Sequence, residues 1–104
     1  LEESGIAGRG AFYDGVGALR DVGQNHILQM LAFVAMEDPK ELNATVIRKN
    51  RAQVLSKLRP IDSANIKRLV SRGQYEGYTS EKNVDPKSDT ETYFKICAYI
   101  DSER

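Results

Sequence analysis

The sequence predicts an α+β fold in which two helices are followed by two antiparallel strands. Apolar residues recur at helical spacing in the first half of the chain, and they alternate with polar residues near its end. Pro39 and Pro60 mark the ends of the two helical segments. Because the helices precede the strands instead of alternating with them, the order favours an antiparallel sheet. We expect these elements to be part of a larger domain of helices and antiparallel sheet.

The first helix is predicted from about Asp14 to Glu37, after a turned loop from Gly5 to Gly10. Glycines inside it are weak points, since each costs about 0.5–1 kcal/mol relative to alanine in a helix. Such glycines point to the close approach of another backbone or of a ligand. Asp38-Pro39 ends the helix, because the residue before a proline is pushed out of the helical region.

The second half of this helix is apolar around its whole circumference. From Ile27 to Met36 only Gln29 is polar, and a helix of this kind requires burial on all sides. The rest of the chain has too few apolar residues to cover it. We therefore expect the covering surface to come from further chain or from a partner subunit.

A second helix is predicted from Ala44 to about Leu58, with Asn43 as its N-terminal cap. Two strands follow, from Ile66 to Tyr75 and from Thr92 to Ile100. The later strand alternates clearly, which places on one face Phe94, Ile96, Ala98 and Ile100. The segment from Glu76 to Thr90 is rich in Gly, Asp, Ser, Asn and Pro, so it is predicted to be a long exposed loop.

The composition excludes several classes of protein. The 104 residues carry 15 basic and 15 acidic side chains, so the chain lacks the basic excess that gives nucleic-acid-binding modules their affinity. Cys97 is the single cysteine, which rules out an internal disulfide and a multi-cysteine zinc site. No apolar run approaches the roughly 20 residues of a membrane span. We expect a soluble cytoplasmic domain that binds neither metal, nucleic acid nor membrane.

His26 is the candidate for acid–base chemistry, because it is the single histidine and histidine is the residue type that changes charge near neutral pH. A lone histidine beside an apolar run is also typical of a core residue. The preceding turn is unusual, since it gathers polar side chains where the helix becomes apolar: Arg20, Asp21, Gln24 and Asn25. Buried polar groups need partners, so this cluster is either a structural network or the wall of a site.

Asp14 has a simpler explanation. A carboxylate in the first turn stabilises the N-terminus of a helix, and Asp14 is expected at that position. It would also share a helix face with Asp21 and Asn25, at spacings of seven and four residues.

Three strings of residues resemble the glucose-6-phosphate dehydrogenase family. They run from Glu2 to Asp14 (EESGIAGRGAFYD), from Gly17 to Asp21 (GALRD) and from Gln24 to Gln29 (QNHILQ). The Arg-Asp-x-x-Gln-Asn-His element is highly specific, and it follows Gly-Arg-Gly and Tyr-Asp in the order typical of that family. The similarity covers most of the chain and fades in the loop from Gly77 to Asp89.

The resemblance implies an enzyme that oxidises glucose 6-phosphate at C1 to 6-phosphogluconolactone and passes the hydride to NADP, in the pentose phosphate pathway. His26 matches the family's general base, which takes the C1 hydroxyl proton as the hydride leaves. Asp21 matches a carboxylate that binds sugar hydroxyls, and Glu2 matches a second substrate-binding carboxylate. Carboxylates suit this role because each accepts several hydrogen bonds.

By the same resemblance, residues 1–104 are the central part of the C-terminal substrate-binding domain. The family's nucleotide-binding Rossmann domain and its Asp-His-Tyr-Leu-Gly-Lys signature are absent from this sequence, so the chain alone is expected to be inactive. The whole enzyme is expected to form a homodimer or tetramer through the sheet. Gly23 departs from the family's pattern, because it replaces a larger apolar residue one turn before His26.

The alternative is a non-catalytic interaction module derived from that domain, which binds a partner through an exposed sheet edge. A basic-helix nucleic-acid binder is disfavoured by the balance of charges.

Overall fold

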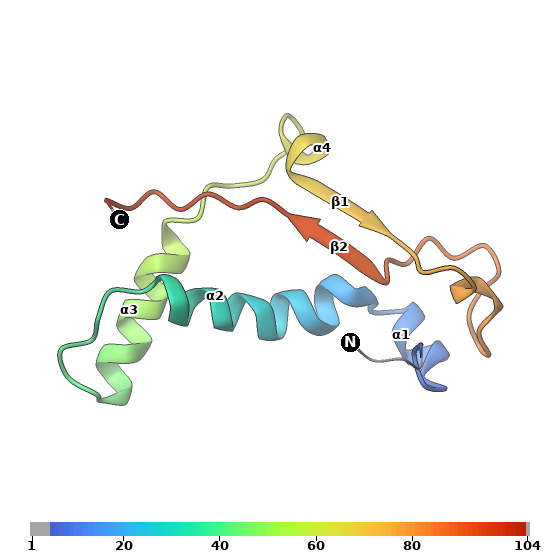
Figure 1. Cartoon of the computed structure of the whole chain (residues 1–104), viewed down its shortest axis with the longest axis horizontal. Helices are drawn as coiled ribbons and strands as arrows, with labels where there is room; N and C mark the ends of the chain where they lie inside the picture. The colour runs from blue at the N-terminus through green and yellow to red at the C-terminus, as the bar shows by residue number, and fades with distance from the viewer. Residues whose placement is uncertain (1–4, 104) are drawn as a thin grey trace.

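The computed structural model describes residues 5–103 and places a helical layer beside a small sheet (Figure 1). The helical elements are α1 (Gly10–Asp14), the π-helix η1 (Leu19–Ile27), α2 (Leu28–Ala35), α3 (Ala44–Ser56), α4 (Ile66–Leu69) and the 3-10 helix η2 (Tyr78–Ser80). The strands are β1 (Val70–Gly73) and β2 (Tyr93–Ile96). The predicted fold class, helices with an antiparallel pair of strands after them, is confirmed.

The two strands form one antiparallel sheet, in which Val70 lies opposite Ile96 and Gly73 lies opposite Tyr93. Beyond this ladder the chain continues beside earlier segments, because the Cys97 N–H donates to the Leu69 carbonyl at 2.8 Å. Figure 1 shows the sheet running alongside the long helical rod formed by η1 and α2. The later strand is therefore shorter than predicted, since β1 provides partners for only four residues.

The prediction of one helix from Asp14 to Glu37 is wrong at its start. α1 ends at Asp14, and Gly17 has a φ of 78°, a left-handed conformation that interrupts any helix. η1 and α2 then run on without a break to Ala35, after which Met36 is extended. Asp14 therefore lies at the C-terminal end of a short helix, and the expected N-terminal role of its carboxylate and its shared face with Asp21 are not observed.

The cap of the second helix is confirmed. The Asn43 side chain accepts a hydrogen bond from the Val46 N–H at 2.9 Å, and α3 begins at the next residue, Ala44. α3 packs across the end of α2, where the Arg51 guanidinium lies 4.4 Å from the centre of the Phe33 ring. The crossing of α2 and α3 is visible at the left of Figure 1.

The first strand was predicted from Ile66, but a helical turn occupies its first four residues. Asp62 and Asn65 cause this turn: the Asp62 carboxylate accepts the N–H groups of Ala64 and Asn65, and the Asn65 side chain accepts the Asp62 N–H. Local side-chain hydrogen bonds therefore start α4, and the strand begins only at Val70.

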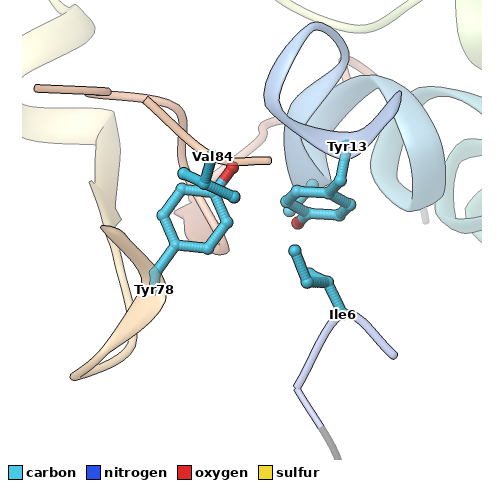
Figure 2. Packing of buried hydrophobic residues seen from close by; sticks show 5 residues of the cluster. Ile6, Tyr13, Tyr78 and Val84 are labelled. Carbon is cyan, nitrogen blue, oxygen red and sulfur yellow. The ribbon is translucent and has the colours of Figure 1, made fainter. Parts of the chain in front are cut away.

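The main core lies where the segment from 75 to 84 packs on α1. Tyr78 is 1% exposed and Val84 is 7% exposed, so the prediction of a fully exposed loop between Glu76 and Thr90 is wrong for these two residues. Figure 2 shows their side chains facing Ile6 and Tyr13, and the Tyr13 and Tyr78 rings meet edge to face with centres 6.0 Å apart. This contact ties the loop to α1.

The chain has a radius of gyration of 17.1 Å, well above the roughly 13 Å typical of a compact domain of this length. Ala32 is the only buried residue of α2, while Met30, Phe33 and Val34 are 65%, 50% and 76% exposed. Within residues 5–103, α3 covers only one end of this helix and most of its apolar side chains stay exposed; that further chain or a partner subunit covers them stays a prediction.

Candidate functional site

Two of the three predicted site residues lie on η1. Asp21 is in its first turn and His26 is in its last. Glu2, the second predicted substrate-binding carboxylate, lies outside the described residues.

A hollow of about 530 Å³ opens between the loop that precedes α1, the η1 helix and the start of β2. Its charged lining residues are Arg9 and Asp21, and four lining residues carry hydroxyl groups: Tyr13, Tyr75, Thr92 and Tyr93. The volume falls within the range of ordinary small-molecule sites. Two opposite charges and four hydroxyl-bearing residues around one hollow suit a polar, hydroxylated ligand.

Two tyrosines of this hollow, Tyr13 and Tyr75, are held as neutral hydroxyl groups. Burial raises the pKa of Tyr13, and the negative charges of Glu91 and Asp21 raise it further. Burial also raises the pKa of Tyr75, whose hydroxyl donates a hydrogen bond to Glu81 Oε1 at 2.9 Å. Both phenols therefore remain protonated at neutral pH.

His26 is exposed and does not line the hollow, although the next residue, Ile27, does. Among residues 5–103, no hydrogen bond or ion pair engages the His26 ring and the ring is exposed, so His26 is not a core residue of this part of the chain. The structure thus brings Asp21 to the hollow and leaves His26 at its margin, on the same helix.

The π-helix is the backbone feature that relates these two residues. In a π-helix each N–H bonds to the carbonyl five residues earlier, as the Leu28 N–H does to Gly23. Residues five apart are therefore near neighbours on one side, whereas in an α-helix they lie roughly 140° apart. Val22 and Ile27, which both line the hollow, are such a pair. Asp21 and His26 are also five residues apart, and each directly precedes one member of that pair in the sequence.

Three contributors to the site were missed from the sequence: Glu91, Phe94 and Tyr75. The Glu91 carboxylate accepts the Leu19 N–H at 3.0 Å, and the Phe94 ring packs where a Gly23 side chain would stand. The available signal was the unusual Gly23, which indicated that something approaches the helix closely at that point.

A second hollow, about 380 Å³ and almost entirely apolar, lies on the other side of Phe94 between η1–α2 and β2. Phe94, Ile96 and Ala98 all line it, in keeping with the alternation predicted for residues 92–100, whereas Ile100, the fourth residue predicted on that face, does not line it and pairs with Leu58. In the part of the chain that the structure describes, no cluster of three metal-ligating side chains occurs. None of the described helices is both long enough and apolar enough to span a bilayer.

The chain matches known proteins over its whole length. Glucose-6-phosphate 1-dehydrogenase 1 of Mycobacterium tuberculosis is 47% identical over 103 residues, which are 99% of this chain and 21% of that protein. The enzyme of Aggregatibacter actinomycetemcomitans is 42% identical over 113 residues, 99% of this chain and 23% of the relative. The chain thus spans less than a quarter of the length of these curated relatives.

Solved structures show the same similarity. The crystal structure of glucose-6-phosphate 1-dehydrogenase from Mycobacterium avium superposes with a TM-score of 0.88 at 45% identity, over 99% of this chain and 22% of that one. A glucose-6-phosphate dehydrogenase in complex with its substrate glucose 6-phosphate superposes with a TM-score of 0.80 at 33% identity, over 93% of this chain and 21% of that one. The family described as the C-terminal domain of glucose-6-phosphate dehydrogenase matches residues 1–104. The chain belongs to the glucose-6-phosphate dehydrogenase C-terminal domain family.

Proposed function

We propose that residues 1–104 are the central part of the substrate-binding domain of a glucose-6-phosphate dehydrogenase. The whole enzyme oxidises glucose 6-phosphate at C1 to 6-phosphogluconolactone, the first step of the pentose phosphate pathway, and works in the cytoplasm. The observation that carries the proposal is the hollow at η1, which is lined by Asp21 and by four residues that carry hydroxyl groups, Tyr13, Tyr75, Thr92 and Tyr93.

Asp21 binds hydroxyl groups of the sugar in this proposal. A carboxylate accepts hydrogen bonds from two neighbouring hydroxyls at once, which fixes the ring in one orientation. Glu2 adds a second carboxylate contact by family resemblance alone.

His26 is the proposed general base. Loss of hydride from C1 builds carbonyl character at that carbon, and removal of the hydroxyl proton by an imidazole nitrogen drives the change forward. Since its ring is exposed and unengaged within the described residues, His26 is available to a substrate that extends from the hollow.

NADP is the hydride acceptor that the family implies, but the residues present do not fit a dinucleotide. The glycine-rich loop from Gly5 to Gly10 leads into α1, a helix of five residues, and the backbone at Gly10 is packed against the Lys82 carbonyl, so no open phosphate cradle exists there. We therefore assign the cofactor to no residue of this chain.

The whole enzyme is proposed to be a homodimer or tetramer that associates through the sheet. β1 and β2 alone form a two-stranded ladder of four residues each, which is too small to be stable without further strands or covering surface.

The test is an absorbance assay for reduced nicotinamide on the full-length protein, with glucose 6-phosphate and first NADP, then NAD. Turnover with either cofactor supports the proposal, and the isolated 104-residue chain is expected to show none. A folded full-length protein that turns over neither would instead favour the interaction module, for which the uncovered face of α2 is the available surface.

A further inference from the structure

Glu91 meets the N-terminus of η1 with both its side chain and its backbone. Its Oε1 atom accepts the Leu19 N–H at 3.0 Å, and its main-chain carbonyl accepts the Ala18 N–H at 3.0 Å and the Tyr13 hydroxyl at 3.3 Å. The Glu91 side chain is only 13% exposed, and its other oxygen lies 3.8 Å from the Arg72 guanidinium. One residue, 72 positions away in the sequence, thus satisfies the first free N–H groups of the helix.

The position is electrostatically favourable as well. The N-terminus of a helix carries a partial positive charge, which a carboxylate at that end stabilises. The Ala18 side chain has no polar atom to cap η1, so the capping group comes from Glu91. Gly17 leaves room for it, because a Cβ built at Gly17 would come within 2.7 Å of Glu91 Oε1.

The same short segment also contacts the middle of η1. Phe94, three residues after Glu91, packs against Gly23 so closely that an added Cβ would lie 2.6 Å from its Cζ atom. Residues 91–94 therefore hold η1 at its first residue and near its centre. Such contacts are needed, since a π-helix of nine residues is a rare conformation that is typically found at functional sites.

We infer that Glu91 is a positioning residue of the active site: its carboxylate fixes the start of η1, and the π register that follows sets Asp21 and His26 on one side of the helix. Glu91 does not line the hollow, so it acts through η1 and not on the substrate. The inference rests on the proposed function and adds to it a residue for which the family resemblance implied no role.

The test uses the full-length dehydrogenase with the variants Glu91→Ala and Glu91→Gln, and Glu76→Ala as the control. Glu76 is an exposed acidic residue that forms no hydrogen bond or ion pair with η1 within the described residues. In Glu91→Ala we expect kcat/KM for glucose 6-phosphate to fall about ten- to hundredfold, as misplacement of reacting groups does. The KM for NADP should stay within about twofold of wild type, because no residue of this chain is assigned to the cofactor.

Glu91→Gln keeps an oxygen that accepts the Leu19 N–H, so it should restore kcat/KM to within about threefold of wild type. A purely structural role would lower kcat in proportion to the loss of folded enzyme and leave the KM for glucose 6-phosphate unchanged, whereas displaced substrate contacts raise that KM. Unchanged kcat/KM in a folded Glu91→Ala variant overturns the inference, and so does an equal loss in Glu91→Gln.

If Glu91→Ala does not fold, Glu91→Asp takes its place. Its carboxylate is one methylene shorter and cannot reach Leu19, so it should be less active than Glu91→Gln; the opposite order contradicts the inference. Wild-type protein without any turnover of glucose 6-phosphate would contradict the proposed function itself, independently of Glu91.

Discussion

The ring of Phe94 occupies the space beside Gly23 in which any other residue would place its side chain. A Cβ built on Gly23 would lie 2.6 Å from Phe94 Cζ and 3.2 Å from Leu19 Cδ1. This contact explains why η1 carries a glycine three residues before His26, although a glycine inside a helix costs about 1 kcal/mol relative to alanine. The glycine allows β2 to approach η1, and the approach closes one side of the hollow that contains Asp21.

Gly23→Ala is therefore expected to destabilise the full-length protein by up to about 2 kcal/mol. Overpacking costs about 1–3 kcal/mol, and the better helix propensity of alanine offsets about 1 kcal/mol of that. Thermal unfolding measures the change. Gly73→Ala is the control, since a Cβ there meets nothing within 4 Å. In a Phe94→Ala background, Gly23→Ala should become neutral or stabilising; the same destabilisation in both backgrounds would show that Phe94 is not the obstacle.

Asp14 is expected to make stability depend on pH at the acid end. Hydrogen bonds from the Ser88 and Tyr78 hydroxyls lower the pKa of Asp14 below its ordinary value. A carboxyl with a lowered pKa contributes stability above its unfolded value, near about pH 4, and loses it as the pH falls through the folded value. Asp14→Asn should thus have a lower Tm than wild type at pH 7, with a gap that narrows below about pH 4. A gap of constant size down to pH 2 would contradict this assignment.

Tyr78 is expected to be the most sensitive position of the core. It is 1% exposed, packs against Tyr13 and Tyr75, and donates a hydrogen bond to Asp14 at 2.8 Å. Tyr78→Phe should cost about 1–2 kcal/mol for the lost hydrogen bond, and Tyr78→Ala about 3–5 kcal/mol. Denaturant unfolding measures both. Tyr99→Phe, at a half-exposed site, should be neutral; an equal effect of the two Tyr→Phe changes would argue against a tightly packed loop.

The segment from 75 to 84 shows why part of the core could not be predicted. Its composition is that of an exposed loop, and Tyr78 and Val84 have no periodic pattern around them. They are buried because α1 and Ile6 lie above them, a contact between segments more than 60 residues apart. By contrast, the cap at Asn43 was predictable, since its partner Val46 is three residues away.

The candidate site likewise has features that could be predicted from the sequence and features that could not. The polar cluster before the apolar run indicated Asp21 and His26, and the family motif supplied their roles. The π register could not be predicted, because propensities do not distinguish it from an α-helix, and the residues that contact it, Glu91 and Phe94, lie far along the chain. The strand prediction failed at Ile66 for a local reason, the mutual hydrogen bonds of Asp62 and Asn65.

The exposed face of α2 predicts the behaviour of the isolated chain. Met30 and Phe33 are at least half exposed, and large uncovered apolar patches drive association in water. We expect the 104-residue chain to associate as its concentration rises, measured by sedimentation velocity. Met30→Gln should reduce association, whereas Leu42→Gln, at an 89% exposed site outside the helix, should leave it unchanged. A monomer at all concentrations would contradict the view that this face requires a cover.

The most direct test of the account is the turnover of His26→Asn in the full-length protein, compared with wild type on glucose 6-phosphate and NADP. Asparagine has similar size and polarity but cannot take up a proton, so the variant isolates the acid–base role. The account predicts a fall in kcat of at least about a hundredfold, with little change in the KM for glucose 6-phosphate. Turnover close to wild type in a folded variant would contradict the assignment of His26 as the general base.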